Sequence, residues 1–174
     1  MSEPVSSLPA ATAAAAPGAS AMRAALGGFA TGVTVVTCCA EGGEAVGLTV
    51  SSFNALSLDP ALVLWSLRLA SPSLAAFDRA SHFAINVLAE SQVDLSRRFA
   101  SGRPDKFDDG AWSAGVGGIP VLAGCVATFE CVCWSRQTAG DHRLFIGQVL
   151  ASSAQAVPPL VYHGGRYHLL GEIL

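Results

Sequence analysis

Lysine is almost absent from this 174-residue chain, which has only Lys106 among ten basic and thirteen acidic side chains. The formal net charge is −3 and the arginines are scattered, so no basic patch of the kind that binds nucleic acid or anionic lipid is formed. The sequence also lacks the run of about 20 apolar residues that a membrane-spanning helix needs. We therefore expect a soluble protein with neither a nucleic-acid nor a membrane partner.

A secretion signal is missing as well. The first residues contain no basic side chain and their Ala-rich run is only weakly apolar, so we expect a cytoplasmic location. Five cysteines are an odd number in a chain of ordinary domain size, which matches a disulfide framework poorly and favours reduced thiols.

A metal site is not indicated either. Cys125, Cys131 and Cys133 share one parity along an expected strand, without a Cys-x-x-Cys pair or histidines at ligand spacing. One buried strand face explains these cysteines better than zinc, so we expect no metal.

Several nucleotide and hydrolase signatures are absent. Gly115, Gly117 and Gly118 lie in a loop before Pro120 and do not open a strand-to-helix turn, so we expect no Rossmann site. The lone lysine follows Asp105, which is not Walker A spacing. Neither a G-x-S-x-G elbow nor an H-E-x-x-H zinc motif occurs.

The residues that are present fit one domain with a sizeable core, because half of them are apolar. We expect an Ala/Pro/Ser-rich tail over 1–20 and one domain over 21–174. Hydrophobic periodicity and turn residues predict helices over 22–29, 71–79 and 91–100, a loop over 102–118, and strands over 33–37, 46–51, 61–67, 83–88, 125–135, 142–151 and 166–170. This pattern favours a β-rich barrel or sandwich over a doubly wound sheet, and its apolar content favours a homodimer.

Two segments carry hydroxyl groups that could bind an anion. Residues 47–54 run from a strand into a loop with three hydroxyls, where backbone N–H groups and side chains can converge on a phosphate. Turn and edge-strand roles are the alternative for such residues. Ser71 and Ser73 at an expected helix start are a second candidate, with helix capping as the alternative.

His142 opens an expected strand and carries an imidazole, the type of side chain that commonly serves as an acid or base. A structural or surface role is the alternative for a lone histidine. Asp141 is not expected to orient it, because adjacent residues of a strand point to opposite faces.

Five segments occur together in one order: 30–37, 47–67, 83–88, 140–142 with Gly147 and Val149, and 159–167. In this arrangement the chain, from about residue 22 to 170, resembles the short-chain flavin reductases that supply reduced flavin to two-component monooxygenases. Val50-Ser51 stands where many members have Ala-Asn, and Ala61 where many have a second proline, which affects the contacts to the flavin ring and the choice between FMN and FAD.

The resemblance implies a six-stranded antiparallel split β-barrel of Greek-key type, the FMN-binding split barrel, with a few short flanking helices. It implies a homodimer that binds FMN, or FAD, takes hydride from NADH or NADPH, and delivers reduced flavin to a flavin-dependent monooxygenase. His142 matches the histidine beside the nicotinamide and the flavin, and we take it as catalytic. The residues implied for cofactor binding are Thr49, Val50, Ser51, Ser52, Phe53, Ser66, Ser71, Ser73, Ala84, Asn86, Val87 and Tyr167.

Two other functions fit the same barrel. A non-catalytic flavin carrier would hold flavin tightly without turning over nicotinamide. A flavin-dependent oxidase would act directly on a small organic substrate.

Overall fold

The structure is a computed structural model that describes residues 18–173, so most of the expected tail over 1–20 lies outside the described residues. These residues include three α-helices, α1 (Ala19–Gly27), α2 (Leu74–Arg79) and α3 (Val93–Phe99), with 3-10 turns at Glu90–Gln92 and Val116–Gly118. The strands are β1 (Thr31–Gly32), β2 (Thr34–Cys39), β3 (Ala45–Val50), β4 (Asn54–Leu58), β5 (Ala61–Arg68), β6 (His82–Val87), β7 (Trp112–Ala114), β8 (Pro120–Leu122), β9 (Ala127–Ala139), β10 (His142–Ala154), β11 (Val161–His163) and β12 (Arg166–His168). The fold is mainly β with few helices, as the sequence predicts.

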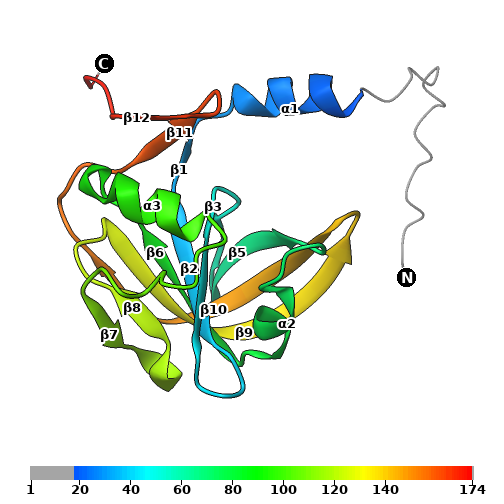
Figure 1. The fold of residues 1–174 in the computed structure, drawn as a ribbon, viewed down its shortest axis with the longest axis vertical. Helices are drawn as coiled ribbons and strands as arrows, with labels where there is room; N and C mark the ends of the chain where they lie inside the picture. The colour runs from blue at the N-terminus through cyan, green and yellow to red at the C-terminus, as the bar shows by residue number, and fades with distance from the viewer. Residues whose placement is uncertain (1–17, 174) are drawn as a thin grey trace.

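One antiparallel sheet organises the molecule, in the order β3-β2-β6-β9-β10-β5-β4 (Figure 1). Its two edge strands, β3 and β4, are consecutive in sequence and are joined by residues 51–53 alone. A connection of three residues spans only about 14 Å even when extended. The sheet must therefore curl until its edges approach each other. Within residues 18–173 no ladder pairs β3 with β4, so the curled sheet is not a closed barrel.

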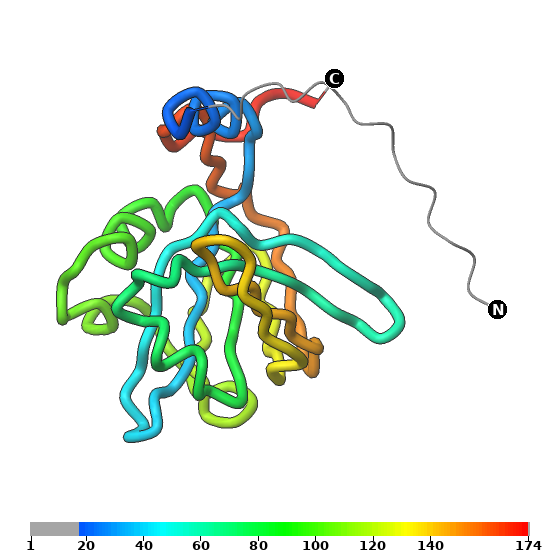
Figure 2. The backbone as a smooth tube through the Cα atoms, turned by 90° about the vertical axis from the view of Figure 1, so that its right-hand side faces the viewer, coloured from blue at the N-terminus to red at the C-terminus, as the bar shows by residue number. Residues whose placement is uncertain are grey.

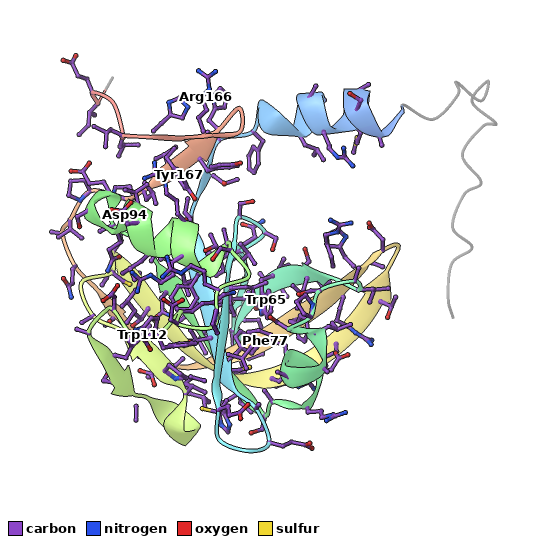
Figure 3. All side chains as sticks on the ribbon, in the orientation of Figure 1. Trp65, Phe77, Asp94, Trp112, Arg166 and Tyr167 are labelled. Atoms are coloured by element: carbon purple, nitrogen blue, oxygen red, sulfur yellow. The ribbon has the colours of Figure 1, made fainter. Side chains whose placement is uncertain are left out.

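The inside of this curl holds an aromatic core. Along β5 the side chains alternate, and Val63, Trp65 and Leu67 are buried while their neighbours are not. Trp65 stacks on Phe145 of β10 at 4.6 Å between ring centroids and meets Phe77 of α2 edge-on at 4.9 Å. The two residues are labelled close together in the interior of the molecule in Figure 3. Burying each large apolar side chain contributes about 1.5–3 kcal/mol, so this cluster fixes β5 and β10 in place.

A second apolar cluster covers the other face of β2 and β6. Val35, Leu88 and Phe99 pack there with Leu122, under α3 and the β7–β8 hairpin. The hairpin is hydrogen-bonded to the sheet, since the Leu122 amide donates to the side chain of Asn86 at 2.9 Å. This face is therefore closed by protein.

Two parts of the chain project from the body. The β4–β5 hairpin extends beyond the rest of the sheet (Figure 2). A small three-stranded sheet of β1, β11 and β12 lies next to α1, at the end of the molecule opposite the β2–β3 turn (Figure 1). Among the described residues no helix is both long and apolar enough to cross a membrane.

Several sequence predictions of local structure were wrong in position or type. The expected loop over 102–118 contains β7 and a 3-10 turn. Residues 54–58 form the edge strand β4, which was not predicted because the hydroxyl-rich segment before it was interpreted as running into a loop. Helix α2 begins three residues after Ser71, because the Ser71 hydroxyl accepts the Ser73 amide and forms a turn of its own. Cys125 lies before β9 and packs in the second cluster, so it does not share the face of Cys131.

Candidate functional site

A cavity of about 580 Å³ opens where the sheet edges approach each other. Its walls come from the end of β3 with the connection to β4, from the end of β5 with the turn that follows, and from the first residue of β10. The lining residues are Leu48, Thr49, Val50, Ser51, Ser52, Ser66, Leu67, Arg68, Ala70, Ser71, Pro72 and His142. The volume falls within the roughly 300–1,000 Å³ range of small-molecule sites.

Hydrogen bonds between Ser52 and Ser66 join the two sides of this opening. The Ser52 hydroxyl donates to the Ser66 carbonyl at 2.9 Å and accepts the Ser66 amide at 3.0 Å. This pair of hydrogen bonds acts as one step of a ladder between the β3–β4 connection and β5. The opening is thus held at a fixed width without a continuous strand pairing.

The hydroxyl groups of the lining are not equally available to a ligand. The Thr49 hydroxyl donates its proton to the Ser96 carbonyl of α3 at 2.7 Å, and that of Ser52 is used as above. Within the described part of the chain no hydrogen bond occupies the hydroxyls of Ser51 and Ser66, and Ser71 only accepts. Ser51, Ser66 and Ser71 can therefore donate to an anion, whereas Thr49 can only accept.

Arg68 and His142 supply the cationic and titratable groups. They are cross-strand partners at the ends of β5 and β10, so both side chains lie at one rim of the cavity. Arg68 was not expected from the sequence, although its position directly after an apolar strand and three residues before Ser71 was a usable signal. A guanidinium beside free hydroxyls is a favourable site for a phosphate.

Asp141 contacts His142, which corrects the expectation from strand alternation. Asp141 lies in the turn before β10, not in the strand, and its carboxylate is 2.8 Å from His142 Nδ1. The hydrogen bond from His142, with the charge of that ring, holds the pKa of the Asp141 carboxyl below its usual range. The contact with Asp141 occupies Nδ1 of the His142 ring, so Nε2 stays available to a ligand in the cavity.

Seven of the thirteen expected site residues meet in this cavity: Thr49, Val50, Ser51, Ser52, Ser66, Ser71 and His142. Two more line neighbouring cavities that share Ser51. Phe53 borders one of about 800 Å³, and Tyr167 borders one of about 210 Å³. Figure 3 shows Tyr167 directed toward α3, where its hydroxyl is 2.9 Å from Ser96 Oγ.

The structure does not bring the other four expected residues into the cavity. Ser73 directly precedes the first residue of α2 and is not part of the cavity lining. Ala84, Asn86 and Val87 belong to β6 in the middle of the sheet, where Ala84 and Asn86 are fully buried. The Asn86 side chain donates to the Val35 carbonyl at 3.0 Å and accepts the Leu122 amide, so it joins the β7–β8 hairpin to the sheet.

The cysteines are free thiols, as expected. Burial raises the pKa of Cys38, Cys125 and Cys131 to about 12, so these thiols stay protonated at neutral pH. Among residues 18–173 no group of three or more potential metal ligands is assembled.

Comparison with known proteins adds to this geometry. A family model described as the flavin reductase like domain matches residues 26–171. The FMN reductase (NADH) SmoA of Agrobacterium fabrum is 46% identical over 146 residues, which cover 83% of this chain and 82% of that protein. The reductase component of a flavin-dependent trigonelline monooxygenase from Acinetobacter baylyi is 42% identical over 84% of this chain. The chain spans only 47% of that second relative.

A solved structure extends the likeness to three dimensions. The NADH:FAD oxidoreductase SgcE6 of Streptomyces globisporus, in complex with NAD and FAD fragments, aligns with a TM-score of 0.83 at 34% identity. The alignment covers 87% of this chain and 92% of that one.

Proposed function

This chain belongs to the flavin reductase like family, and we propose that it transfers hydride from NADH or NADPH to FMN, or FAD, and passes the reduced flavin to a flavin-dependent monooxygenase. The observation that carries the proposal is the cavity between the sheet edges, where free hydroxyls, Arg68 and His142 face one space. When bound, the flavin supplies the redox chemistry, because it accepts a hydride from a nicotinamide.

The residues present fit a flavin phosphate. Arg68 and the Ser71 hydroxyl lie at one rim of the cavity and offer a charge and a hydrogen-bond donor. Ser51 and Ser66 offer further donors, and Leu48 and Val50 offer apolar surface for a planar ring. We assign phosphate binding to the first pair and ring contact to these other lining residues.

The protein's contribution to the reaction is alignment. Holding two reactants in one orientation replaces the entropy cost of their encounter and lowers the barrier by several kcal/mol. His142 is the one titratable side chain of the lining besides Arg68, and Asp141 fixes its ring. We assign His142 the role of positioning the nicotinamide and holding or donating a proton through Nε2.

Steady-state oxidation of NADH and NADPH tests the proposal, with FMN, FAD or riboflavin added and absorbance followed in air. Turnover that rises with free flavin is expected, and FMN should outperform riboflavin because only FMN has the phosphate. A bound yellow chromophore without turnover would instead support a flavin carrier. Consumption of an organic substrate without a second protein would support a direct oxidase.

The split-barrel arrangement and the homodimer are part of the same proposal. The curled sheet, tied across its opening by Ser52 and Ser66, supports the split-barrel arrangement. The projecting β4–β5 hairpin has exposed leucines, 46% for Leu56 and 96% for Leu58, which supports a homodimer. The cytoplasmic location stays a prediction.

A further inference from the structure

An ion pair joins helix α2 to the strand that carries His142. Arg143 Nη2 of β10 donates to Asp78 Oδ2 of α2 at 3.3 Å, and Arg143 Nε lies 3.2 Å from Asp78 Oδ1. The guanidinium therefore faces the carboxylate with two nitrogens. Only 28% of the Arg143 side chain and 27% of the Asp78 side chain are exposed, so water and salt screen this pair less than a surface pair.

Helix α2 depends on such contacts because it is short. It has six residues, and Phe77 is the buried one among them. A helix of fewer than about 12 residues is marginal in water by itself, so packing against the rest of the chain determines where α2 lies. Phe77 anchors it to the core at Trp65, and Arg136 Nη2 of β9 donates to the Phe77 and Ala80 carbonyls at its C-terminal end. The Asp78–Arg143 pair is the contact between α2 and β10 that involves charges on both sides.

The position of α2 determines that of Ser71. The Ser71 carbonyl accepts the amide of Leu74, the first residue of α2, at 3.1 Å, and the Ser71 hydroxyl accepts the Ser73 amide at 3.3 Å. On its other side, the Ser71 amide donates to the Arg68 carbonyl at 2.9 Å. Ser71 is thus bonded to the end of β5 and to the start of α2. A shift of α2 therefore moves the Ser71 hydroxyl relative to Arg68.

Two consecutive residues of β10 serve the cavity and α2 separately. His142 lines the cavity and pairs across the strands with Arg68, whereas Arg143 contacts Asp78. Adjacent residues of a strand point to opposite faces, which explains this division. The same strand end therefore sets the positions of His142, of Arg68 and, through the ion pair, of α2.

We propose that Arg143 is a positioning residue for the flavin phosphate, acting through Asp78 and α2 on the Ser71 hydroxyl. The inference rests on the proposed function, because it takes the phosphate to lie between Ser71 and Arg68. Arg143 is not part of the cavity lining, so it does not contact a flavin bound there. Any effect of its replacement on phosphate binding has to pass through α2.

The test compares FMN with riboflavin, which has the same ring and no phosphate, in the full chain and in its Arg143→Gln and Asp78→Asn variants. The KM for FMN should rise about three- to tenfold in either variant, the effect of weakening one hydrogen bond to the phosphate. The KM and kcat for riboflavin should stay the same. Arg143→Lys keeps the charge and should restore most of the affinity for FMN.

Arg79→Ala is the matched control. Arg79 belongs to the same helix and forms an ion pair with Glu41, but the two side chains are 63% and 73% exposed. An exposed pair contributes little to the position of a helix, so the KM for FMN should stay at the wild-type value.

A double variant separates positioning from a general loss of structure. Ser71→Ala lacks the hydroxyl through which Arg143 acts, so adding Arg143→Gln to it should leave the KM for FMN unchanged. A further rise in that background would overturn the inference. Equal rises for FMN and riboflavin in Arg143→Gln would overturn it as well, and so would an unchanged KM for FMN in both single variants.

Failure of the proposed function has a different signature. Absence of turnover in the wild type would contradict the reductase function, and the Kd values of FMN and riboflavin, measured by flavin fluorescence, would then give the same comparison for the same variants. Equal Kd values for the two flavins in a wild type that turns over would overturn the inference alone, because the phosphate would not be bound.

Discussion

His142 is the side chain on which the chemistry of the candidate site depends most. Its ring lies at the rim of the cavity beside Arg68, its cross-strand partner, with Nδ1 held 2.8 Å from the Asp141 carboxylate. The contact exists because the β9–β10 turn places Asp141 beside the strand and not within it. A half-buried histidine thereby acquires a fixed orientation.

Replacing this ring tests its role. His142→Ala should lower kcat/KM for NADH on the order of 10², the usual contribution of a general acid or base, and leave the Kd of FMN within about threefold. Stopped-flow reduction and flavin fluorescence measure the two quantities separately. Asp141→Asn keeps the ring and should have a smaller effect. Weaker flavin binding with an unchanged hydride step would assign His142 to flavin binding alone.

Three buried thiols make stability depend on alkaline pH. Burial raises the pKa of Cys38, Cys125 and Cys131 from 9.0 to about 12. The folded state therefore holds these protons more tightly than the unfolded state does, and the stabilisation is complete below about pH 9. It should be lost progressively as pH rises from 9 to about 12.

Urea unfolding between pH 8 and 11 measures this loss. Other groups titrate in the same range, so the comparison with Cys131→Ala isolates one thiol, and this variant should show a shallower decline. Cys39→Ala, which alters a partly exposed neighbour of the core, serves as the control. Parallel declines in wild type and Cys131→Ala would contradict the assignment.

At the scale of elements, β10 depends on a glycine where its backbone approaches the side chains of Phe83 in β6 and Cys131 in β9. The pairing of β10 with β9 shifts register between Ile146 and Gly147. A Cβ at position 147 would overlap the Phe83 ring and lie 2.8 Å from Cys131 Cβ. The backbone of β10 thus approaches the core more closely than any larger residue permits.

Gly147→Ala should therefore lower the free energy of unfolding by about 1–3 kcal/mol, the usual cost of overpacking. Gly42→Ala is the matched control, because nothing lies within 4 Å of a Cβ there and its backbone is not left-handed. The control should stay within about 0.5 kcal/mol of wild type in urea unfolding. Equal stability of the two variants would show that β10 can move away from Phe83.

Helix α3 is hydrogen-bonded both to β3 and to the β11–β12 hairpin through one buried residue, Ser96. The Ser96 carbonyl accepts the Thr49 hydroxyl at 2.7 Å, and the Ser96 side chain meets the Tyr167 hydroxyl at 2.9 Å. Arg97 lies over the Tyr167 ring at 5.7 Å from its centroid. The small cavity between Thr49 and Tyr167 is therefore bordered by groups that one helix holds in register.

Ser96→Ala removes the bond to Tyr167 and keeps the carbonyl that holds Thr49. The free energy of unfolding should fall by about 0.5–1.5 kcal/mol, the net value of one hydrogen bond. Tyr167→Phe should cost a similar amount, and the double variant should cost little more than either, because both remove the same contact. Fully additive losses in urea unfolding would argue against the Ser96–Tyr167 bond.

At the scale of the whole molecule, the exposed apolar side chains of the β4–β5 hairpin are a candidate contact between two copies of the chain. Leu56 and Leu58 extend from an edge strand whose outer backbone groups have no neighbouring strand in the described chain. Such an edge is a ready surface for a second copy. A dimer formed there would cover both leucines.

If the proposed homodimer forms at this edge, Leu56→Asp with Leu58→Asp should produce a monomer, since a charge buried in an interface without a partner is strongly unfavourable. Light scattering on a sizing column measures the mass of each species. Leu150→Asp, which adds a charge at an exposed leucine of β10, should leave the mass the same as that of the wild type. A monomeric wild type, or a dimer that survives the double substitution, would place any association elsewhere.

The sequence by itself determined six of the seven strands of the main sheet, with β4 missed, the class of fold and, through its ordered motifs, the reductase function that the comparisons bear out. Alternating apolar residues, as in β5, encode a strand locally because one face must be buried. The hydroxyls of residues 49–52 were likewise visible as a candidate site. Local patterns of this kind do not specify which distant strand pairs with which.

Only the tertiary structure decided the site itself. The curl of the sheet brings Ser52 to Ser66, and the register of β5 with β10 places Arg68 beside His142. The same long-range packing carries Asn86 into the sheet interior. These contacts follow from strand order and hydrogen-bond register, which depend on the whole chain at once and leave no mark in the spacing of neighbouring residues.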